Sequence, residues 1–194
     1  MSKAQTTREA ILREAFAQAS QFGLESLTIG DLAQRCALSK SGLFGHFRSR
    51  DNLQLAVLEY AAEVFRERVI TPVRQETHEN QADKLRALLR AWLAWNQDFS
   101  GRCMFLDAWT SPQNGAVQQG ARHFVHDWLT YLQRQIHQGI EQGAWQAELD
   151  PWQAVYRLYS LYLGEQVFGD LGLSQHPDQR FWPEVEALLA SWRH

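Results

Sequence analysis

The sequence predicts an all-α protein with two helical domains, the first of them a small helix-turn-helix domain. Apolar residues recur at the helical period of 3.6 residues along almost the whole chain, and no convincing strand-like alternation is found. Only 5 of the 194 residues are proline, and most of them lie at the edges of the periodic segments. We expect one domain over residues 1–52 and a larger helical domain over residues 53–194.

The composition is that of an ordinary folded domain with enough residues to bury a core without disulfide bonds. The two cysteines, Cys36 and Cys103, are far apart in the sequence, which indicates a reducing compartment rather than a disulfide framework. The first ten residues contain no apolar signal segment, and no stretch is long enough to predict a transmembrane helix. We therefore expect a cytoplasmic protein without a membrane partner.

Capping residues delimit the N-terminal helices. Thr6 and Glu9 have the spacing of a capping box, so a first helix is expected from Thr6 to Gly23, a candidate C-cap. A second helix is expected to begin at Thr28, with Asp31 at the matching position of a second capping box.

A very short turn at Ala37 and Leu38 separates this second helix from a third. Ser39 is a good N-cap for that third helix, which should end near Phe47, and Ser49 should cap a long fourth helix. The later helices are expected over residues 85–99, 104–109, 117–140, 151–168 and 183–193.

Charge is distributed unevenly along the chain. The net charge is −3, but residues 1–52 contain seven Lys or Arg against five Asp or Glu. Lys40, Arg48 and Arg50 lie within eleven positions, with His46 between them. A local basic patch on an acidic protein is suited to contact with phosphate.

The third helix has the residues that a DNA-reading helix needs. Small residues let the backbone approach the bases, polar residues reach base edges and phosphates, and Leu43 and Phe47 can anchor the helix in the domain core. The N–H groups that begin the second and fourth helices are available to phosphate. An ordinary helical hairpin would not need exposed small and basic residues there. The residues expected at DNA are Thr28, Ser39, Lys40, Ser41, Gly42, Phe44, Gly45, His46, Arg48 and Arg50.

In these positions the sequence resembles the TetR family of bacterial transcriptional regulators. The matching stretch runs from Gly23 to Leu53 and includes Thr28-Ile29-x-Asp31-Leu32-Ala33, Leu38-Ser39-Lys40-Ser41-x-Leu43-Phe44-x-His46-Phe47 and Ser49-Arg50-Asp51-x-Leu53. The resemblance implies a homodimer that binds double-stranded operator DNA of palindromic sequence. It also implies a small-molecule inducer that binds in the C-terminal domain, moves the connecting helix and spreads the two DNA-binding heads.

The chain departs from the family pattern at three points. Ala37 stands in the turn where glycine is common, and a positive φ there would cost about 1 kcal/mol. Phe44-Gly45 replaces a common tyrosine, so one phenolic hydroxyl that usually reaches phosphate is absent. Arg50 replaces a lysine, and it can still pair with phosphate.

The second domain is rich in aromatic residues, which favours a pocket for a hydrophobic or aromatic, weakly charged ligand. Aromatic stripes at helical spacing also form ordinary cores, and both interpretations stay open. Polar residues that could orient a ligand are Asn96, Asp107, His123, Asp127 and Gln166. The candidate pocket residues are Trp92, Trp95, Phe99, Phe105, Trp109, Phe124, Trp128 and Tyr159.

The segment 151–168 is apolar nearly all round, so a helix there needs partners on both sides. With the last helix it could form a four-helix bundle across a two-fold axis, although complete burial within one subunit is the alternative. The candidate dimer residues are Tyr156, Leu163, Gly164, Val167, Leu188, Leu189 and Trp192.

A DNA-binding transcriptional regulator, released from its operator by a ligand, is thus the predicted function. The alternatives are a ligand-independent DNA-binding or protein-interaction module and, less favoured, a helical enzyme, for which no Gly-rich phosphate loop, HExxH or GxSxG motif is found. His123 and His126 have metal-ligand spacing, but no third ligand is near in sequence, so no metal and no cofactor are expected. Repression rather than activation rests on the family resemblance alone.

Overall fold

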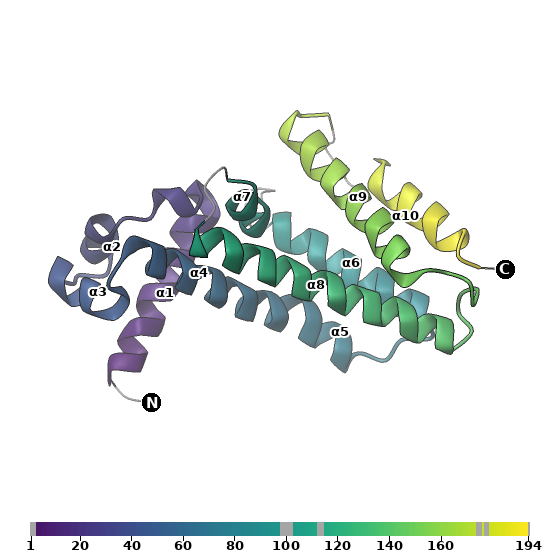
Figure 1. The fold of residues 1–194 in the computed structure, drawn as a ribbon, viewed down its shortest axis with the longest axis horizontal. Coiled ribbons are helices and arrows are strands. Elements are labelled where there is room, and N and C mark those ends of the chain that lie inside the picture. The colour runs from purple at the N-terminus through teal and green to yellow at the C-terminus, as the bar shows by residue number, and fades with distance from the viewer. Residues whose placement is uncertain (1–2, 98–102, 112–114, 174–175, 177–178, 194) are drawn as a thin grey trace. The chain divides into compact units, whose positions relative to one another are not determined.

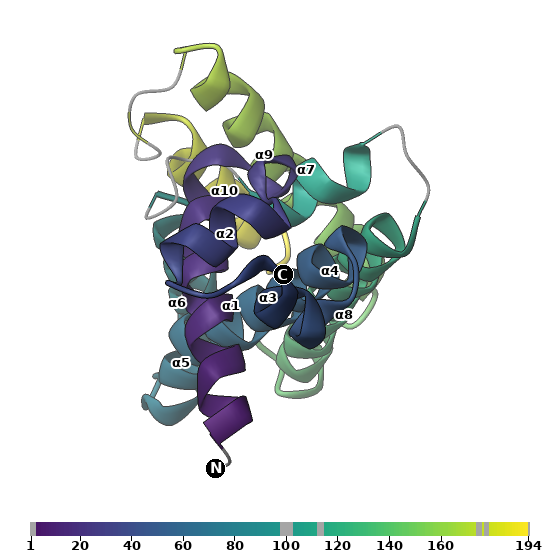
Figure 2. The ribbon, with the colours of Figure 1, turned by 90° about the vertical axis from the view of Figure 1, so that its left-hand side faces the viewer.

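The chain begins with a series of helices in the computed structural model, which describes residues 3–97, 103–111, 115–173, 176 and 179–193 (Figure 1). The N-terminal elements are α1 (Lys3–Phe22), a 3-10 turn (Leu24–Ser26), α2 (Ile29–Arg35), α3 (Lys40–Phe47) and α4 (Arg50–Phe65). Figure 2 views this part of the chain with α2 and α3 towards the reader.

Most of the predicted helix ends are confirmed. The hydroxyl of Thr28 accepts from the N–H of Asp31, that of Ser39 from Gly42, and that of Ser49 from Asn52. Gly23, at φ 80°, ends α1. The expected start of α1 at Thr6 is wrong, because the helix already begins at Lys3 and Thr6 lies inside it.

The chain stays helical beyond α4. A π-helical turn (Arg66–Ile70) leads into α5 (Thr71–Gln75), whose second residue is Pro72. The later helices are α6 (Gln81–Gln97), α7 (Met104–Thr110), α8 (Ala116–Glu141), α9 (Pro151–Asp170) and α10 (Phe181–Ala190). The described residues contain no strand, and no helix among them is long and apolar enough to cross a membrane.

Two compact units divide the chain, one formed by residues 1–68 and 96–125 and the other by residues 69–95 and 126–194. In the first unit, α1, α2, α3 and α4 pack around buried apolar side chains that include Ile11, Leu32, Leu43 and Leu53. The buried amide of Gln54 also donates to the carbonyl oxygen of Leu24 at 2.8 Å, which joins α4 to the chain before α2. α2 and α3 are thus held in place by packing against α1 and α4.

In the second unit, the C-terminal residues are held by ring packing and hydrogen bonds. The rings of Trp145 and Trp192 meet edge to face at 5.4 Å between centroids, and the N–H of Gln146 donates to the carbonyl oxygen of Trp192 at 2.9 Å. Arg86 of α6 binds both carboxylate oxygens of Glu186 on α10, each at 2.8 Å. α10 is therefore fixed to its own unit at its middle and just beyond its C-terminal end.

Candidate functional site

One face of α3 packs against the rest of the first unit. Leu43 and Phe47 are buried, as predicted for the residues that anchor this helix in the core. At its start, the hydroxyl of Ser39 accepts from the N–H of Gly42 at 3.0 Å and lies 3.2 Å from the hydroxyl of Ser41. These contacts fix the helix and leave its other face to solvent.

The open face of α3 is made of small, basic and aromatic residues. Lys40, Ser41, Gly42, Phe44 and Gly45 are all exposed, Phe44 by 52% of its surface. A Cβ atom added to Gly45 would meet nothing within 4 Å. Packing inside the chain therefore does not require glycine at that position, whereas close approach to another molecule would.

The side chain of Lys40 lies against the start of α2. Its Cε and Nζ atoms come within 3.4 and 3.6 Å of where a Cβ on Gly30 would stand. The neighbouring Thr28 hydroxyl accepts from the N–H of Asp31 and donates to its carboxylate at 2.8 Å. Lys40 thus offers a positive charge at the surface shared by α2 and α3, while Thr28 acts chiefly as a cap.

Two residues that are not glycine have left-handed backbone at the two ends of α3. Ala37, in the turn before it, has φ 53°, so the position does need the conformation that glycine adopts freely. Arg48, the residue after it, has φ 65°, and its N–H donates to the carbonyl oxygen of Phe44 at 2.7 Å. This geometry ends α3 sharply and leaves the Arg48 side chain exposed.

Arg50 has a role that the sequence did not predict. Its Nε atom donates to the carbonyl oxygen of Leu27 at 2.9 Å, and its Nη2 atom donates to both the carbonyl oxygen and the carboxylate of Glu25. These bonds direct two of the guanidinium nitrogens to the chain itself. In this structure Arg50 joins the start of α4 to the segment before α2, and its expected contact with phosphate stays a prediction.

His46 lies half-buried in the last turn of α3, with its ring 6.2 Å from the ring of Phe47. On the other side, the guanidinium of Arg8 from α1 stands over the Phe47 ring at 5.4 Å. The end of α3 is thus an aromatic contact flanked by basic groups.

Four of the candidate pocket residues, Trp92, Trp95, Trp128 and Tyr159, belong to the second unit. Trp92 is the centre of the ring contacts there, at 5.3 Å from Trp128, 6.0 Å from Tyr159 and 3.9 Å from Tyr162. Tyr162 was not among the predicted pocket residues, although it follows Tyr159 by one helical turn. Trp92 stacks on Tyr159 and Tyr162 and meets Trp128 edge to face.

The remaining candidates belong to the first unit or cannot be described. Phe105 and Phe124 have ring centroids 5.9 Å apart. Among the described residues, the side-chain nitrogen and oxygen of the buried Asn96 have no hydrogen-bond partner, and neither does the indole nitrogen of the half-buried Trp109. Phe99 lies outside the described residues. Unsatisfied buried polar atoms cost free energy, so Asn96 and Trp109 are places where a ligand or water could bind.

The exposed apolar residues of the second unit are concentrated on α9 and the residues just after it. Tyr156 is 68% exposed and Val167 55%, Leu163 is half-buried, and a Cβ on Gly164 would meet nothing within 4 Å. The set continues with Trp152, Phe168, Leu171 and Leu173.

The predicted dimer residues of the last helix are placed differently. Leu188, Leu189 and Trp192 are buried within their own unit, so their inclusion in an exposed interface is corrected. An open pocket of about 310 Å³ does lie between α9 and α10, where Tyr156 and Leu161 face Ala187 and the edge of Leu188. The apolar face thus extends from α9 onto α10 through this pocket.

Cys36 follows the last residue of α2 and is half-buried. Burial raises the pKa of the Cys36 thiol, and the negative charge of Glu14 raises it further, so the reactive thiolate is disfavoured. Among the described residues, no group of three His, Cys, Asp or Glu side chains could hold a metal ion.

Comparison with protein families gives two matches that together cover most of the chain. Residues 11–57 match the model of bacterial regulatory proteins of the tetR family, and residues 82–184 match the tetracyclin repressor-like C-terminal domain. The second match alone extends over more than half of the chain. The chain belongs to the TetR family. It is accordingly a transcription regulator with a helix-turn-helix DNA-binding domain, and its family is one of regulators rather than enzymes.

Several solved structures with the TetR fold are similar to this chain over most of its length. The comparison with curated proteins found no match. A TetR-family transcriptional regulator from Cytophaga hutchinsonii has a TM-score of 0.85 and 18% identity, covering 100% of this chain and 98% of that one. A transcriptional regulator from Saccharomonospora viridis, in complex with choline, has a TM-score of 0.71 and 18% identity, covering 84% and 85%. AibR, in complex with isovaleryl coenzyme A and operator DNA, has a TM-score of 0.62 and 20% identity, covering 89% of each chain.

Proposed function

We propose that this regulator is a homodimeric cytoplasmic repressor that binds a palindromic operator through α3 and is released by a small hydrophobic or aromatic ligand. The observation that carries the proposal is the open face of α3, where Lys40, Ser41 and Gly45 are exposed and Gly45 has no packing role. A helix with a buried anchor and an exposed face of small and basic residues is suited to the major groove.

Contacts with the phosphate backbone would come from Lys40 and Arg48, which lie at the two ends of α3. Both side chains are exposed, and among the described residues neither makes an ion pair with a carboxylate. Each should therefore be available to a phosphate, with a salt-dependent contribution to affinity. Ser39, Ser41, Gly42, Phe44 and Gly45 would face the bases, and His46 would lie close to the backbone.

A second copy of this chain is the occupant that we assign to the apolar face of α9. Tyr156, Leu163, Gly164 and Val167 form the predicted part of that face, and a two-fold axis would bring the same residues together from both subunits. Two α3 helices are also what a palindromic site requires, because each half-site presents one major groove. The net charge of only +2 in residues 1–52 favours affinity that depends on both heads.

The ligand is proposed to bind among the aromatic residues of the C-terminal part. In the second unit the rings around Trp92 would have to separate, which is a change that could move the helices carrying them. In the first unit the unsatisfied polar atoms of Asn96 and Trp109 would orient a ligand beside Phe105. Two proteins of similar fold have structures with a small molecule, one with choline and the other with isovaleryl coenzyme A. A ligand that binds one conformation better than the other shifts the equilibrium by that difference.

Footprinting upstream of the protein's own gene, with a random-sequence selection beside it, tests the DNA-binding claim. We expect a palindromic site whose occupancy falls with salt, and Lys40→Ala should weaken it whereas Arg134→Ala, which removes an exposed charge from α8, should not. If neither experiment finds a salt-sensitive palindromic site, the proposal that this protein binds an operator through α3 is wrong.

Dimerisation is tested by sedimentation of the Tyr156→Asp and Val167→Asp variants. A charge in the apolar face should produce monomers, whereas Gln138→Asp, at an exposed position of α8, should leave the dimer intact. Monomeric wild-type protein would contradict the assignment.

Release by a ligand is tested by a thermal-shift screen of apolar and aromatic compounds, followed by operator binding in the presence of each hit. If no compound stabilises the protein and operator binding is tight, the ligand-independent module is the better description. If a compound stabilises the protein and strengthens operator binding, the regulator is not an inducer-released repressor.

A further inference from the structure

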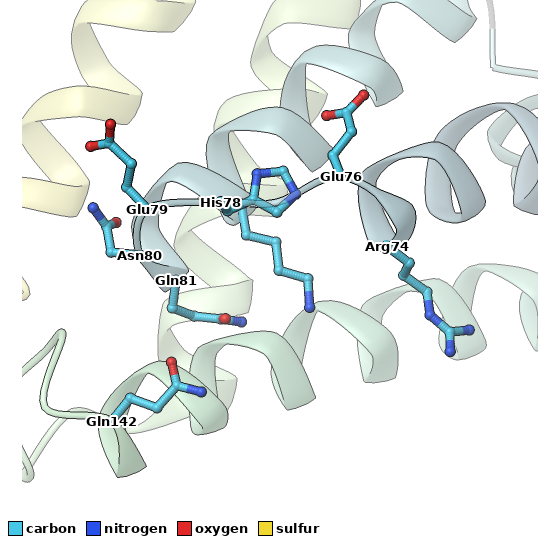
Figure 3. Close-up of a pocket in the computed structure, with 8 residues that line it drawn as sticks. Arg74, Glu76, His78, Glu79, Asn80, Gln81 and Gln142 are labelled. Carbon is cyan, nitrogen blue, oxygen red and sulfur yellow. The ribbon is translucent and has the colours of Figure 1, made fainter.

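An open polar pocket of about 300 Å³ lies in the second unit, and none of the candidate aromatic pocket residues lines it (Figure 3). Its lining comes from the end of α5, the segment before α6, the first turn of α6 and the residue after α8. None of these residues belongs to the predicted DNA, ligand or dimer sets, so the proposed function gives the pocket no role.

Two cationic side chains, Arg74 and Lys84, line this pocket without a carboxylate partner among the residues that the structure describes. Burial lowers the pKa of Lys84, and the positive charge of Arg74 lowers it further. The same charge of Arg74 acts on Tyr131, whose buried hydroxyl has no hydrogen-bond partner in the part of the chain that the structure describes. Two like charges are therefore close enough to repel each other, and an anion between them would relieve that repulsion.

Among the described residues, the acidic residues of the lining form no ion pair with Arg74 or Lys84. Figure 3 shows the carboxyl groups of Glu76 and Glu79 turned to the side opposite the guanidinium of Arg74 and the amide of Gln142. The nearby Asp83 is bound by Asn80 and by Arg86. A cation would meet two positive charges in this pocket, whereas an anion would meet attraction from both.

Hydrogen-bond donors complete the site. Asn80 accepts the N–H of Asp83, and the N–H of Lys84 donates to the carbonyl oxygen of Asn80. The N–H groups of Gln81 and of the following residue are the two that begin α6 without a bond inside the helix. The amide of Gln81 donates to the buried Gln135, which holds this first turn in place. The start of α6 thus adds its partial positive charge to that of Arg74 and Lys84.

We propose that this pocket binds a small oxyanion, a phosphate or carboxylate group, between the side chains of Arg74 and Lys84 at the start of α6. The lining shares no residue with the candidate aromatic pocket, and the proposal does not depend on the proposed inducer. A charged effector bound there would make this regulator responsive to a second class of molecule.

Isothermal titration calorimetry with inorganic phosphate and with succinate, in chloride buffer of matched ionic strength, tests the site and separates the two sources of the oxyanion. We expect at least one of the two to bind, with affinity reduced roughly tenfold by Arg74→Gln or Lys84→Gln, since each removes a charge-assisted hydrogen bond. The matched control Arg134→Gln removes an exposed positive charge from α8 outside the lining and should bind as the wild type does.

Thermal unfolding keeps the test decisive if a variant is less stable. In chloride buffer Lys84→Met should be at least as stable as the wild type, because it removes a repelled charge, but it should lose the rise in Tm that phosphate or succinate causes. The absence of binding by both anions, or an equal loss in Arg134→Gln, would overturn the proposal.

Discussion

Arg50 donates from Nη2 to the carbonyl oxygen of Glu25 at 2.6 Å and to its carboxylate at 2.8 Å. The third bond of the same guanidinium, from Nε to the carbonyl oxygen of Leu27, brings the first residue of α4 against the chain that precedes α2. α3, the helix proposed to read DNA, lies between these two segments in sequence. Its position therefore depends on a side chain that the sequence alone indicated as a phosphate contact.

Replacing Arg50 by Gln should lower the free energy of unfolding by about 1–3 kcal/mol, because two backbone carbonyl groups lose a charged donor. Replacing Glu25 by Gln should change it by about 0.5 kcal/mol or less, since the ion pair is exposed and the backbone bonds remain. Urea unfolding of both variants measures the difference. Equal losses would mean that the ion pair, rather than the carbonyl bonds, stabilises the joint.

The helix caps show what local sequence can predict. Thr28, Ser39 and Ser49 cap helices as expected, because an N-cap needs only a side-chain oxygen and an N–H two or three residues later. The positive φ at Ala37 was suggested only by the family resemblance, in which glycine is common in that turn. All-α architecture follows equally from periodicity.

Long-range partners could not be predicted in this way. The contact between Arg50 and Glu25 spans 25 residues and depends on how α1 to α4 pack. The apolar face of the last helix predicted burial, but periodicity does not say whether Leu189 and Trp192 meet their own unit or a second subunit. The pocket at Arg74 and Lys84 brings together segments that no short motif connects.

Replacing Ala37 by Gly should stabilise the protein by about 0.5–1 kcal/mol. The left-handed backbone at φ 53° is strained for alanine, and this gain exceeds the greater entropy of glycine in the unfolded chain. The control Ala17→Gly, at an exposed position inside α1, should instead destabilise by about 1 kcal/mol. Chemical denaturation of the two variants gives opposite signs if the backbone at Ala37 is strained, and a loss in both would refute it.

Replacing Gly45 by Ala should raise the free energy of unfolding by up to about 1 kcal/mol, because the added Cβ meets nothing and alanine favours the helix. The same methyl group would stand on the face proposed to approach the bases, so operator affinity should fall. Denaturation and electrophoretic mobility shift on the same samples separate the two effects. Unchanged affinity would show that Gly45 does not come close to DNA.

Replacing Gly139 by Ala should destabilise the second unit by roughly 1–3 kcal/mol, because the new Cβ would overlap the ring of the buried Trp145. The distance would be 2.1 Å to ring atom Cζ3, so either α8 or the indole must move. Since Trp145 packs against Trp192, near-ultraviolet circular dichroism should change together with Tm. Gly164→Ala, which meets nothing within 4 Å, is the control and should not lower the stability of the folded unit. A wild-type Tm for Gly139→Ala would mean that the indole can move aside freely.

The ion pair between Arg86 and Glu186 should make stability depend on acid. Hydrogen bonding to Arg86 is the main reason why the pKa of Glu186 lies below its ordinary value. A carboxyl group whose pKa is lower in the folded state binds protons more readily in the unfolded chain. Its contribution is therefore complete above the unfolded pKa and is lost as the pH falls through the folded-state pKa.

The Glu186→Gln variant should accordingly be less stable than the wild type near neutral pH, and this difference in the free energy of unfolding should shrink in acid. Glu184→Gln, at an exposed position of the same helix, should keep the wild-type pH dependence. Urea unfolding at about pH 7 and about pH 3, on either side of the ordinary glutamate pKa, measures the slope. A constant difference between Glu186→Gln and the wild type at both values would contradict a lowered pKa, since the pair would then contribute equally whether or not the carboxyl group is ionised.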